Sequence, residues 1–232
     1  MIYVAVADAN DFLENQIKIN AKVIKRIEKS SSESEKKIRA TAYHAMFLLL
    51  ERFCSDGWHK TQKLDLCYTD AGKPYFEQQK NENKGLQKVP SISISHDKNV
   101  AVAVISDAEK IGIDIQGDSV PKRRMERIAA RFFTPINKAG ESSEGIDEEI
   151  QWFLAKGDRL LDINEGFSKK ELREEKESFD FLAKWTKLEA VIKASGGGFL
   201  DYPQLEELLP TAKTKTFVLT KEKSEYVITI AK

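Results

Sequence analysis

Two polar side chains at alternate positions of a predicted strand have the types needed to hold a metal ion. In residues 111–116 every second side chain points to the same face, so Asp114 and Gln116 project together and the isoleucines between them face the core. A carboxylate and an amide oxygen are hard ligands of the kind that Mg²⁺ prefers. Alternating polar positions are also ordinary in half-solvated sheets, so this pattern alone favours a surface-facing pair on an edge strand.

A second pair of interest lies on a predicted helix over residues 181–194. Glu189 and Lys193 are one turn apart on a common face, beside an apolar stripe that includes Trp185 and Leu188. Such a pair is most often a helix-stabilising ion pair worth about 0.3 kcal/mol. It could instead present a carboxylate to a metal and an ammonium to a phosphate, as phosphoryl transfer requires. The sequence leaves both interpretations open.

Two turns supply weaker candidates for ligand contacts. Ser95 and His96 close an alternating strand over residues 91–95, at the point where a turn begins. Lys73 lies in the turn 70–74, where its neighbours could aim its ammonium at a phosphate or at water.

The elements that must position these residues follow from hydrophobic periodicity and turn signals. The predicted strands cover residues 2–7, 64–68, 91–95, 100–105, 111–115, 216–219 and 226–230, and the predicted helices begin at 36, 122 and 181, the last ending at Gly196. The connection 106–110 is short enough for an antiparallel hairpin, so three strands are expected to meander through the middle of the chain. This order predicts an α+β fold of two halves, residues 1–107 and 108–232.

The net charge of zero conceals an uneven distribution. The chain has 37 Lys and Arg residues against 37 Asp and Glu residues, but residues 138–180 hold 13 acidic and 7 basic side chains. This stretch contains Trp152, Phe153 and Leu154, so we expect a packed, helical, acidic insertion in the second half.

Composition excludes several classes of protein. With 41% hydrophobic residues the chain can bury a core, and its longest apolar run near a helix signal is too short to span a bilayer. The first residues lack a basic leader, and the two cysteines suggest neither a disulfide framework nor a zinc site, so a cytoplasmic location is expected. The basic segment 18–39 and the helix beginning at 122 do not interleave aromatic and basic residues, which argues against a nucleic-acid partner.

Five short motifs in order are more specific than any one of them. They are Gly72-Lys73-Pro74, Ser95-His96, Gly112-Ile113-Asp114-Ile115, Arg131-Phe132-Phe133 and the run from Trp185 to Lys193. In this order and spacing the chain resembles the 4'-phosphopantetheinyl transferases, over about residues 39–199. The resemblance is to the longer, single-chain type that activates carrier proteins of fatty-acid, polyketide or nonribosomal-peptide synthesis.

The resemblance implies both a fold and a reaction. The fold would be two similar α+β halves packed as a pseudo-dimer, each with a small antiparallel sheet against helices. In the reaction, a serine hydroxyl of an apo acyl or peptidyl carrier protein attacks the β-phosphate of coenzyme A and displaces 3',5'-ADP. The partners expected are therefore coenzyme A and a carrier protein, with no nucleic acid and no membrane, and the chain is expected to be a monomer.

The resemblance also implies roles for single residues. Asp114 and Glu189 would hold Mg²⁺ or, in its place, Mn²⁺, with Gln116 as a direct or water-mediated ligand. Glu189 would also accept the proton of the nucleophile. Lys193 would contact the phosphates near the reacting phosphorus. The residues expected to hold the 3'-phosphate, the nucleotide and the diphosphate are Arg39, Lys73, Ser95 and His96.

Three features of the sequence depart from the family pattern. Gln116 stands where members usually have a second acid, and Asn137 lies near the place of another common acid. Lys187 and Leu188 reverse an apolar and basic order that many members show, and the helical stripe predicts that Leu188 is buried while Lys187 points outward. The first two departures motivate an alternative, namely a coenzyme A or carrier-protein binder with lost or weak transferase activity.

Overall fold

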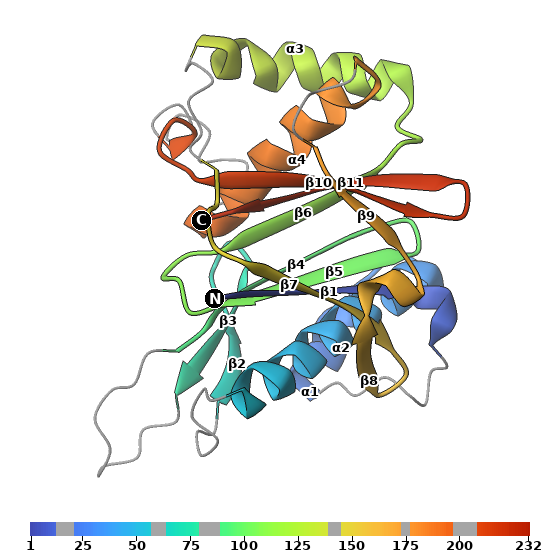
Figure 1. Cartoon of the computed structure of the whole chain (residues 1–232), viewed down its shortest axis with the longest axis vertical. Coiled ribbons are helices and arrows are strands. Elements are labelled where there is room, and N and C mark those ends of the chain that lie inside the picture. The colour runs from blue at the N-terminus through green and yellow to red at the C-terminus, as the bar shows by residue number, and fades with distance from the viewer. Residues whose placement is uncertain (13–20, 57–63, 79–88, 139–144, 173–176, 197–207) are drawn as a thin grey trace.

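Four layers stack on one another in the computed structural model, which describes residues 1–12, 21–56, 64–78, 89–138, 145–172, 177–196 and 208–232. Figure 1 shows two helices on the outside of a five-stranded sheet, then a four-stranded sheet, then two more helices. The protein is therefore a mixed α+β structure with sheets packed against helices. Apolar side chains from both sheets fill the space between them.

The first sheet has the order β4-β5-β1-β7-β8. Its strands are β1 (Ile2–Asp8), β4 (Ser91–Asp97), β5 (Val100–Ser106), β7 (Ile150–Lys156) and β8 (Arg159–Asp162). β1 is antiparallel to β5 but parallel to β7, so the expectation of a purely antiparallel sheet is wrong here. In β1 the side chains of Val4 and Val6 face the second sheet, while Ala5 and Ala7 face the helical layer.

The second sheet has the order β6-β11-β10-β9. Its strands are β6 (Gly112–Gly117), β9 (Ser168–Glu171), β10 (Thr214–Lys221) and β11 (Ser224–Ala231). β10 and β11 contain the strands predicted at 216–219 and 226–230, and they pair as an antiparallel hairpin. The predicted three-strand meander is wrong, because β5 pairs with β4 and β1 whereas β6 pairs with β11. Apolar side chains of β5 and β6 share one core, so these strands lie in stacked sheets. A short connection allows either arrangement.

The acidic segment is not helical as expected. Of its described residues, most form β7, β8, β9 and the short 3-10 helix η3 (Ile163–Glu165), while 139–144 and 173–176 lie outside the described residues. Trp152 and Leu154 are both buried and lie two positions apart, which is the period of a strand. The helix was predicted from the number of apolar residues, without regard to this spacing. β7 and β8 join the first sheet and β9 the second.

Long helices cover the outer faces of the sheets. α2 (Glu33–Ser55) covers the first sheet with α1 (Ala21–Ile27) beside it, and α4 (Glu177–Ser195) covers the second, with α3 (Lys122–Lys138) outermost. The predicted stripe of α4 is buried at Trp185, Leu188 and Ile192. α4 ends before Gly196, whose φ of +80° suits a residue without a side chain. A hairpin of β2 (Leu64–Tyr68) and β3 (Pro74–Gln78), and the 3-10 turn η1 (Ala9–Asp11), complete the described elements.

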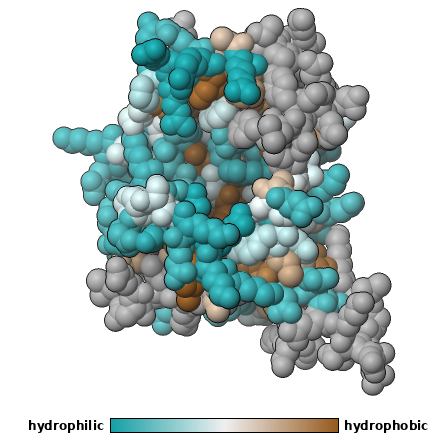
Figure 2. Space-filling model, turned by 180° about the vertical axis from the view of Figure 1, so that it is seen from behind, coloured by the Kyte–Doolittle hydropathy of each residue, from teal (hydrophilic) through white to brown (hydrophobic). Residues whose placement is uncertain are grey.

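One face of the molecule is mainly polar. Figure 2 shows that hydrophilic side chains predominate on this face and that hydrophobic ones form small, scattered patches. The large hydrophobic side chains that remain exposed among the described residues are Met1, Ile24 and Tyr75. Among the helices of the described ranges, none combines the length and the apolar character that crossing a membrane demands.

The two sheets share a strand order. In the first sheet β1 pairs antiparallel with β5, which also pairs with β4, the strand before it in the chain. In the second sheet β6 pairs antiparallel with β11, which also pairs with β10, the strand before it in the chain. β4 and β6 are edge strands of their sheets, and the side chains of β4 contact β6 directly.

Candidate functional site

A cleft of about 510 Å³ opens where β4 and β6 meet. Every site residue proposed from the sequence lines this cleft, although the residues come from α2, the turn before β3, β4, β6 and α4. They are Arg39, Lys73, Ser95, His96, Asp114, Gln116, Glu189 and Lys193. The tertiary structure thus brings the whole proposed set to one place.

Gly112 explains how α4 comes close enough to β6 to share this cleft. A Cβ atom at this position would lie 1.9 Å from the carbonyl oxygen of Ala190 and 2.6 Å from the amide nitrogen of Ala194. Since both are backbone atoms of a packed helix, only glycine fits here. The glycine of the Gly112-to-Ile115 motif therefore sets the distance between the strand that carries Asp114 and the helix that carries Glu189 and Lys193.

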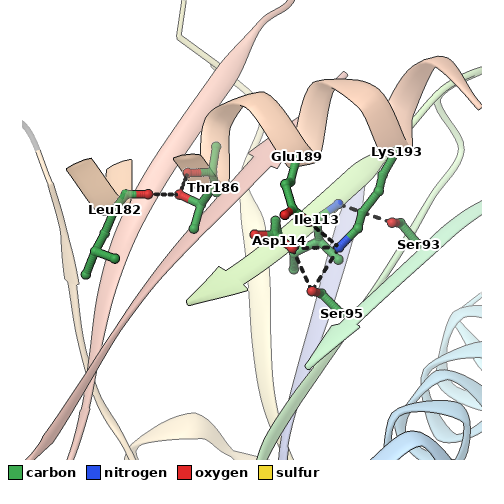
Figure 3. Close-up of polar contacts among 9 residues, drawn as sticks. Ser93, Ser95, Ile113, Asp114, Leu182, Thr186, Glu189 and Lys193 are labelled. Carbon is green, nitrogen blue, oxygen red and sulfur yellow. Dashed lines mark hydrogen bonds and ion pairs between the residues drawn. The ribbon is translucent and has the colours of Figure 1, made fainter. Parts of the chain in front are cut away.

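A partly buried, hydrogen-bonded ion pair forms the centre of the site. Lys193 Nζ lies 2.6 Å from Asp114 Oδ1 and donates a 2.9 Å hydrogen bond to Ser95 Oγ. Ser95 Oγ in turn donates to Asp114 Oδ1 at 2.7 Å. In Figure 3, Glu189 and Lys193 extend from α4 toward Asp114 of β6, and Ser95 approaches from β4. Asp114 is 3% exposed, so its charge depends on these partners.

The pKa of Glu189 departs strongly from the ordinary value of a carboxyl group. Burial raises its pKa to about 8, with further contributions from the charge of Asp114 and from a hydrogen bond between the two carboxyl groups. The Lys193 ammonium, 3.8 Å from Glu189 Oε2, opposes this shift. Two carboxyl groups in contact cannot both ionise at low cost unless a proton or another cation lies between them. The pair therefore has the electrostatic character of a site for a cation.

The donor set fits Mg²⁺ with help from a substrate. Among the residues that the structure describes, no group of three or more His, Cys, Asp or Glu side chains is arranged to hold a metal. Asp114 and Glu189 supply two carboxylates, and Gln116 lines the same cleft with an amide oxygen. Mg²⁺ in proteins commonly takes one or two carboxylates and completes its octahedron with water and substrate phosphates.

Arg39 and His96 lie near each other in the cleft, and His96 is on the face of β4 opposite to Ser95. The pKa of His96 is lowered by burial and then by the charges of Arg39 and Lys193, so the imidazole is neutral at pH 7. Arg39 forms a 2.6 Å ion pair with Glu35, and its Nε is buried without a hydrogen-bond partner. A buried guanidinium donor with spare capacity is suited to an anionic ligand.

Lys73 makes contacts that the sequence did not suggest. Its Nζ donates hydrogen bonds of 3.2 Å to the carbonyl oxygens of Ile111 and Ala194, at the start of β6 and the end of α4. Burial, with a smaller effect of Lys110, lowers the pKa of Lys73 to about 8. Lys73 therefore ties the β3 turn to β6 and α4 while also lining the cleft.

Several lining residues were missed by sequence reasoning. Arg26 donates a 2.8 Å hydrogen bond to the carbonyl of Gly72 and lies 4.4 Å from the centre of the Tyr68 ring, and Arg124 of α3 lowers the pKa of Glu189. No periodicity distinguishes these arginines from neighbouring basic residues. Ser93 and Asp97 also line the cleft, and they could have been found, since they alternate with Ser95 on β4.

Thr186 gives the motif on α4 a structural member. Its Oγ1 is fully buried, donates to the carbonyl of Leu182 at 2.9 Å (Figure 3) and lies 2.8 Å from Thr229 Oγ1 on β11. It therefore anchors α4 to the second sheet at a distance from the ion pair.

A comparison with protein families and with curated proteins found no family model and no curated protein that matches this chain.

Proposed function

We propose that this protein is a Mg²⁺-dependent 4'-phosphopantetheinyl transferase that moves the phosphopantetheine arm of coenzyme A to a serine of a carrier protein. The observation that supports this most is the meeting of Asp114, Glu189 and Lys193 in one cleft, although they come from a strand and a helix 75 or more positions apart. Their types and contacts match what transfer between phosphate esters requires, namely cation ligands, a base and a phosphate contact.

The charge of the cleft suits a polyphosphate substrate. Arg26, Arg39, Lys73, Arg124 and Lys193 line it together with the carboxyl groups already described. In the proposed complex Arg39, Lys73, Ser95 and His96 hold the 3'-phosphate, the nucleotide and the diphosphate of coenzyme A. Guanidinium and ammonium groups at the edge of a partly enclosed cleft attract and orient such an anion.

Asp114 and Glu189 would hold Mg²⁺, or Mn²⁺ in its place, with Gln116 contributing directly or through water. When bound, the ion supplies neutralisation of the charge on the pyrophosphate. Lys193 is already within reach of Asp114 and would contact a phosphate oxygen next to the reacting phosphorus. The new bond forms between the carrier serine oxygen and the β-phosphorus, and the bond that breaks releases 3',5'-ADP.

Glu189 is suited to accept the proton of the serine hydroxyl. A general base works best when its pKa lies near the working pH, and burial beside Asp114 raises the pKa of Glu189 to about 8. The proton passes from the serine oxygen to Glu189 as the new bond to phosphorus forms. No covalent bond between enzyme and substrate is needed.

The shared strand order of the two sheets supports a pseudo-dimer. We infer that residues 1–107 and 108–232 are two related halves, each contributing one sheet edge to the cleft. Such an arrangement makes a monomer sufficient for activity, since β4 and β6 of a single chain build the site. A cytoplasmic location would supply both coenzyme A and apo carrier proteins.

The basic helix α3 is the surface we assign to the carrier protein. Its exposed cations include Lys122, Arg123, Arg127 and Arg131, and Arg124 reaches the cleft. Cations on the helix that also supplies Arg124 to the cleft would attract an acidic partner and bring its serine toward Glu189.

The direct test is mass spectrometry of apo carrier proteins after incubation with coenzyme A, Mg²⁺ and this protein. A gain equal to one phosphopantetheine, lost when Mg²⁺ is chelated, is the expected result. Absence of any gain across a panel of apo carriers, under conditions where a known transferase modifies them, would contradict the proposal.

A second candidate is a coenzyme A or carrier-protein binder without turnover. Gln116 favours it, because an amide in place of an acid leaves the cleft one charge short, and Lys193 already neutralises Asp114. Calorimetry that shows tight coenzyme A binding by a chain that modifies no carrier would support this candidate.

A further inference from the structure

One face of β4 joins the two sheets through side chains. Ser91 Oγ donates to the carbonyl of Glu109 at 2.6 Å, Ser93 Oγ accepts the N–H of Ile113 at 3.2 Å, and Asp97 Oδ2 accepts the N–H of Gly117 at 2.8 Å. Between the last two lies Ser95, which donates to Asp114. Alternate residues of one strand thus follow the edge of another strand in a different sheet.

The edge of β6 needs these acceptors. Within the described part of the chain, β6 pairs with β11 on one side, and its other edge faces β4, which itself pairs only with β5. A buried backbone N–H without an acceptor is costly, and no backbone ladder between β4 and β6 supplies one. Ser93, which is 2% exposed, and Asp97 fill this role on either side of Asp114.

We propose that Ser93 and Asp97 are positioning residues for the cation site. They hold the β6 edge at Ile113 and Gly117, so that Asp114 stays against Ser95 and Lys193 and within reach of Glu189. Gly117 supports this, because a Cβ there would lie 3.0 Å from Asp97 Oδ2, which shows how closely the Asp97 carboxylate approaches the backbone of β6. The inference rests on the proposed function in that the ion held by Asp114 and Glu189 is Mg²⁺.

Ser91 provides a matched control. It lies on the same face of the same strand and makes one hydroxyl-to-backbone bond, but its partner Glu109 precedes β6 and is five residues from Asp114. Removing its hydroxyl group tests the loss of a comparable hydrogen bond without releasing the β6 edge.

The experiment measures Mn²⁺ binding to the full chain, with and without coenzyme A, by electron paramagnetic resonance of the free ion. Thermal unfolding of each variant is followed in parallel. Loss of a residue that orients a metal ligand typically weakens binding at least about 10-fold, so Ser93→Ala and Asp97→Ala should do so. Ser91→Ala should change affinity less than about 2-fold, as expected for a hydrogen bond outside the site.

Asp97→Asn separates position from charge. The amide oxygen can still accept the N–H of Gly117, so this variant should restore most of the affinity that Asp97→Ala loses, although it removes the same charge. In the transfer assay, the variants that weaken binding should raise the Mg²⁺ concentration needed for half-maximal rate and leave KM for the carrier unchanged.

Wild-type affinity in both alanine variants, or equal losses in these variants and in Ser91→Ala, would overturn the inference and leave the proposed function standing. A wild-type chain that binds Mn²⁺ in a manner abolished by Asp114→Asn, yet modifies no carrier, would contradict the proposed function instead. A wild-type chain that binds no Mn²⁺ under either condition would overturn both.

Discussion

The edge of β6 that faces away from β11 corresponds to the edge of β1 that faces away from β5, but the two edges have different neighbours. The edge of β6 meets β4 through side chains, and a polar cleft results. The edge of β1 is closed by β7, which pairs with it from Ile2 to Ala7, and β9 covers the edge of β10. Backbone pairing uses the amide groups and brings strands within about 5 Å of each other. Strands that meet through side chains lie farther apart and leave space for a polar cleft.

The side chains at the two places differ accordingly. Near the covered edges, the rings of Trp152 and Phe217 meet at 4.9 Å, and Lys169 Nζ lies 5.0 and 5.6 Å from their centres. At the open edge, an ammonium lies among oxygen atoms of Asp114 and Ser95. The same layered architecture thus yields a closed apolar joint on one side and a polar site on the other.

The largest expected effect is on the rate of transfer, and it distinguishes the roles of two residues near the open edge. Glu189→Gln removes the proposed base and should lower the transfer rate at least about 100-fold. Gln116→Ala removes only a neutral oxygen and should cost far less. Single-turnover rates of carrier modification provide the measurement. Equal losses in the two variants would contradict the unequal roles proposed for Glu189 and Gln116.

Replacing a lysine at each edge sharpens the comparison. Lys193→Met should slow transfer about 100-fold, because a phosphate contact is lost. It should also tighten Mn²⁺ binding by about 3- to 10-fold, because no ammonium then competes for Asp114. Lys169→Met, at the covered edge, should leave Mn²⁺ binding as in the wild type. Weaker Mn²⁺ binding by Lys193→Met would contradict the competition between ammonium and ion.

Two glycines offer a test of packing at the two edges. Gly112→Ala places a methyl group against the α4 backbone and should lower the free energy of unfolding by about 3 kcal/mol. Gly166→Ala, beside β7, meets the tip of the Leu154 side chain at 2.8 Å, which can turn away, so a loss of about 1 kcal/mol is expected. Chemical denaturation measures both. Similar losses would mean that α4 can shift away from β6.

The smallest effect is a dependence of stability on pH without divalent ions. Because the pKa of Glu189 is raised to about 8, the folded chain keeps a proton that the unfolded chain releases, so stability falls as pH rises from about 4.5 through 8. The pKa of Lys73 is lowered to about 8, so between 8 and 10.5 the unfolded chain holds the extra proton and stability rises again.

The melting temperature should therefore pass through a minimum near pH 8 that is at least about 2–4 °C deep, which is the shift expected for each change of about 1 kcal/mol in a chain of this size. Scanning calorimetry in a chelating buffer provides the curve. Glu189→Gln should remove the fall below pH 8, and saturating Mn²⁺ should oppose it. A minimum that persists unchanged in Glu189→Gln would assign the effect to other groups.

Local patterns predicted much of this molecule. The period of two in residues 91–95 and 111–115 correctly predicted strands, with Ile113 and Ile115 facing the core, and the apolar stripe of α4 correctly predicted that Leu188 is buried. The surface-facing position that the pattern alone favoured for Asp114 is wrong, since this residue is 3% exposed. The same reasoning failed for the acidic segment, where the number of apolar residues was weighed without their alternation, and for the meander, where a short connection was taken to imply pairing.

The sequence by itself determined which residue types face each side of each strand and helix, because those periods follow from backbone geometry. It therefore placed Asp114 with Gln116, and Glu189 with Lys193. Only the tertiary structure decided that, among the described strands, none pairs with the second edge of β6, and that β7 closes the edge of β1. It also decided that Ser95, Asp114 and Lys193 meet across 98 positions of the chain. Strand pairing and sheet stacking depend on contacts between distant segments, and no local period encodes them.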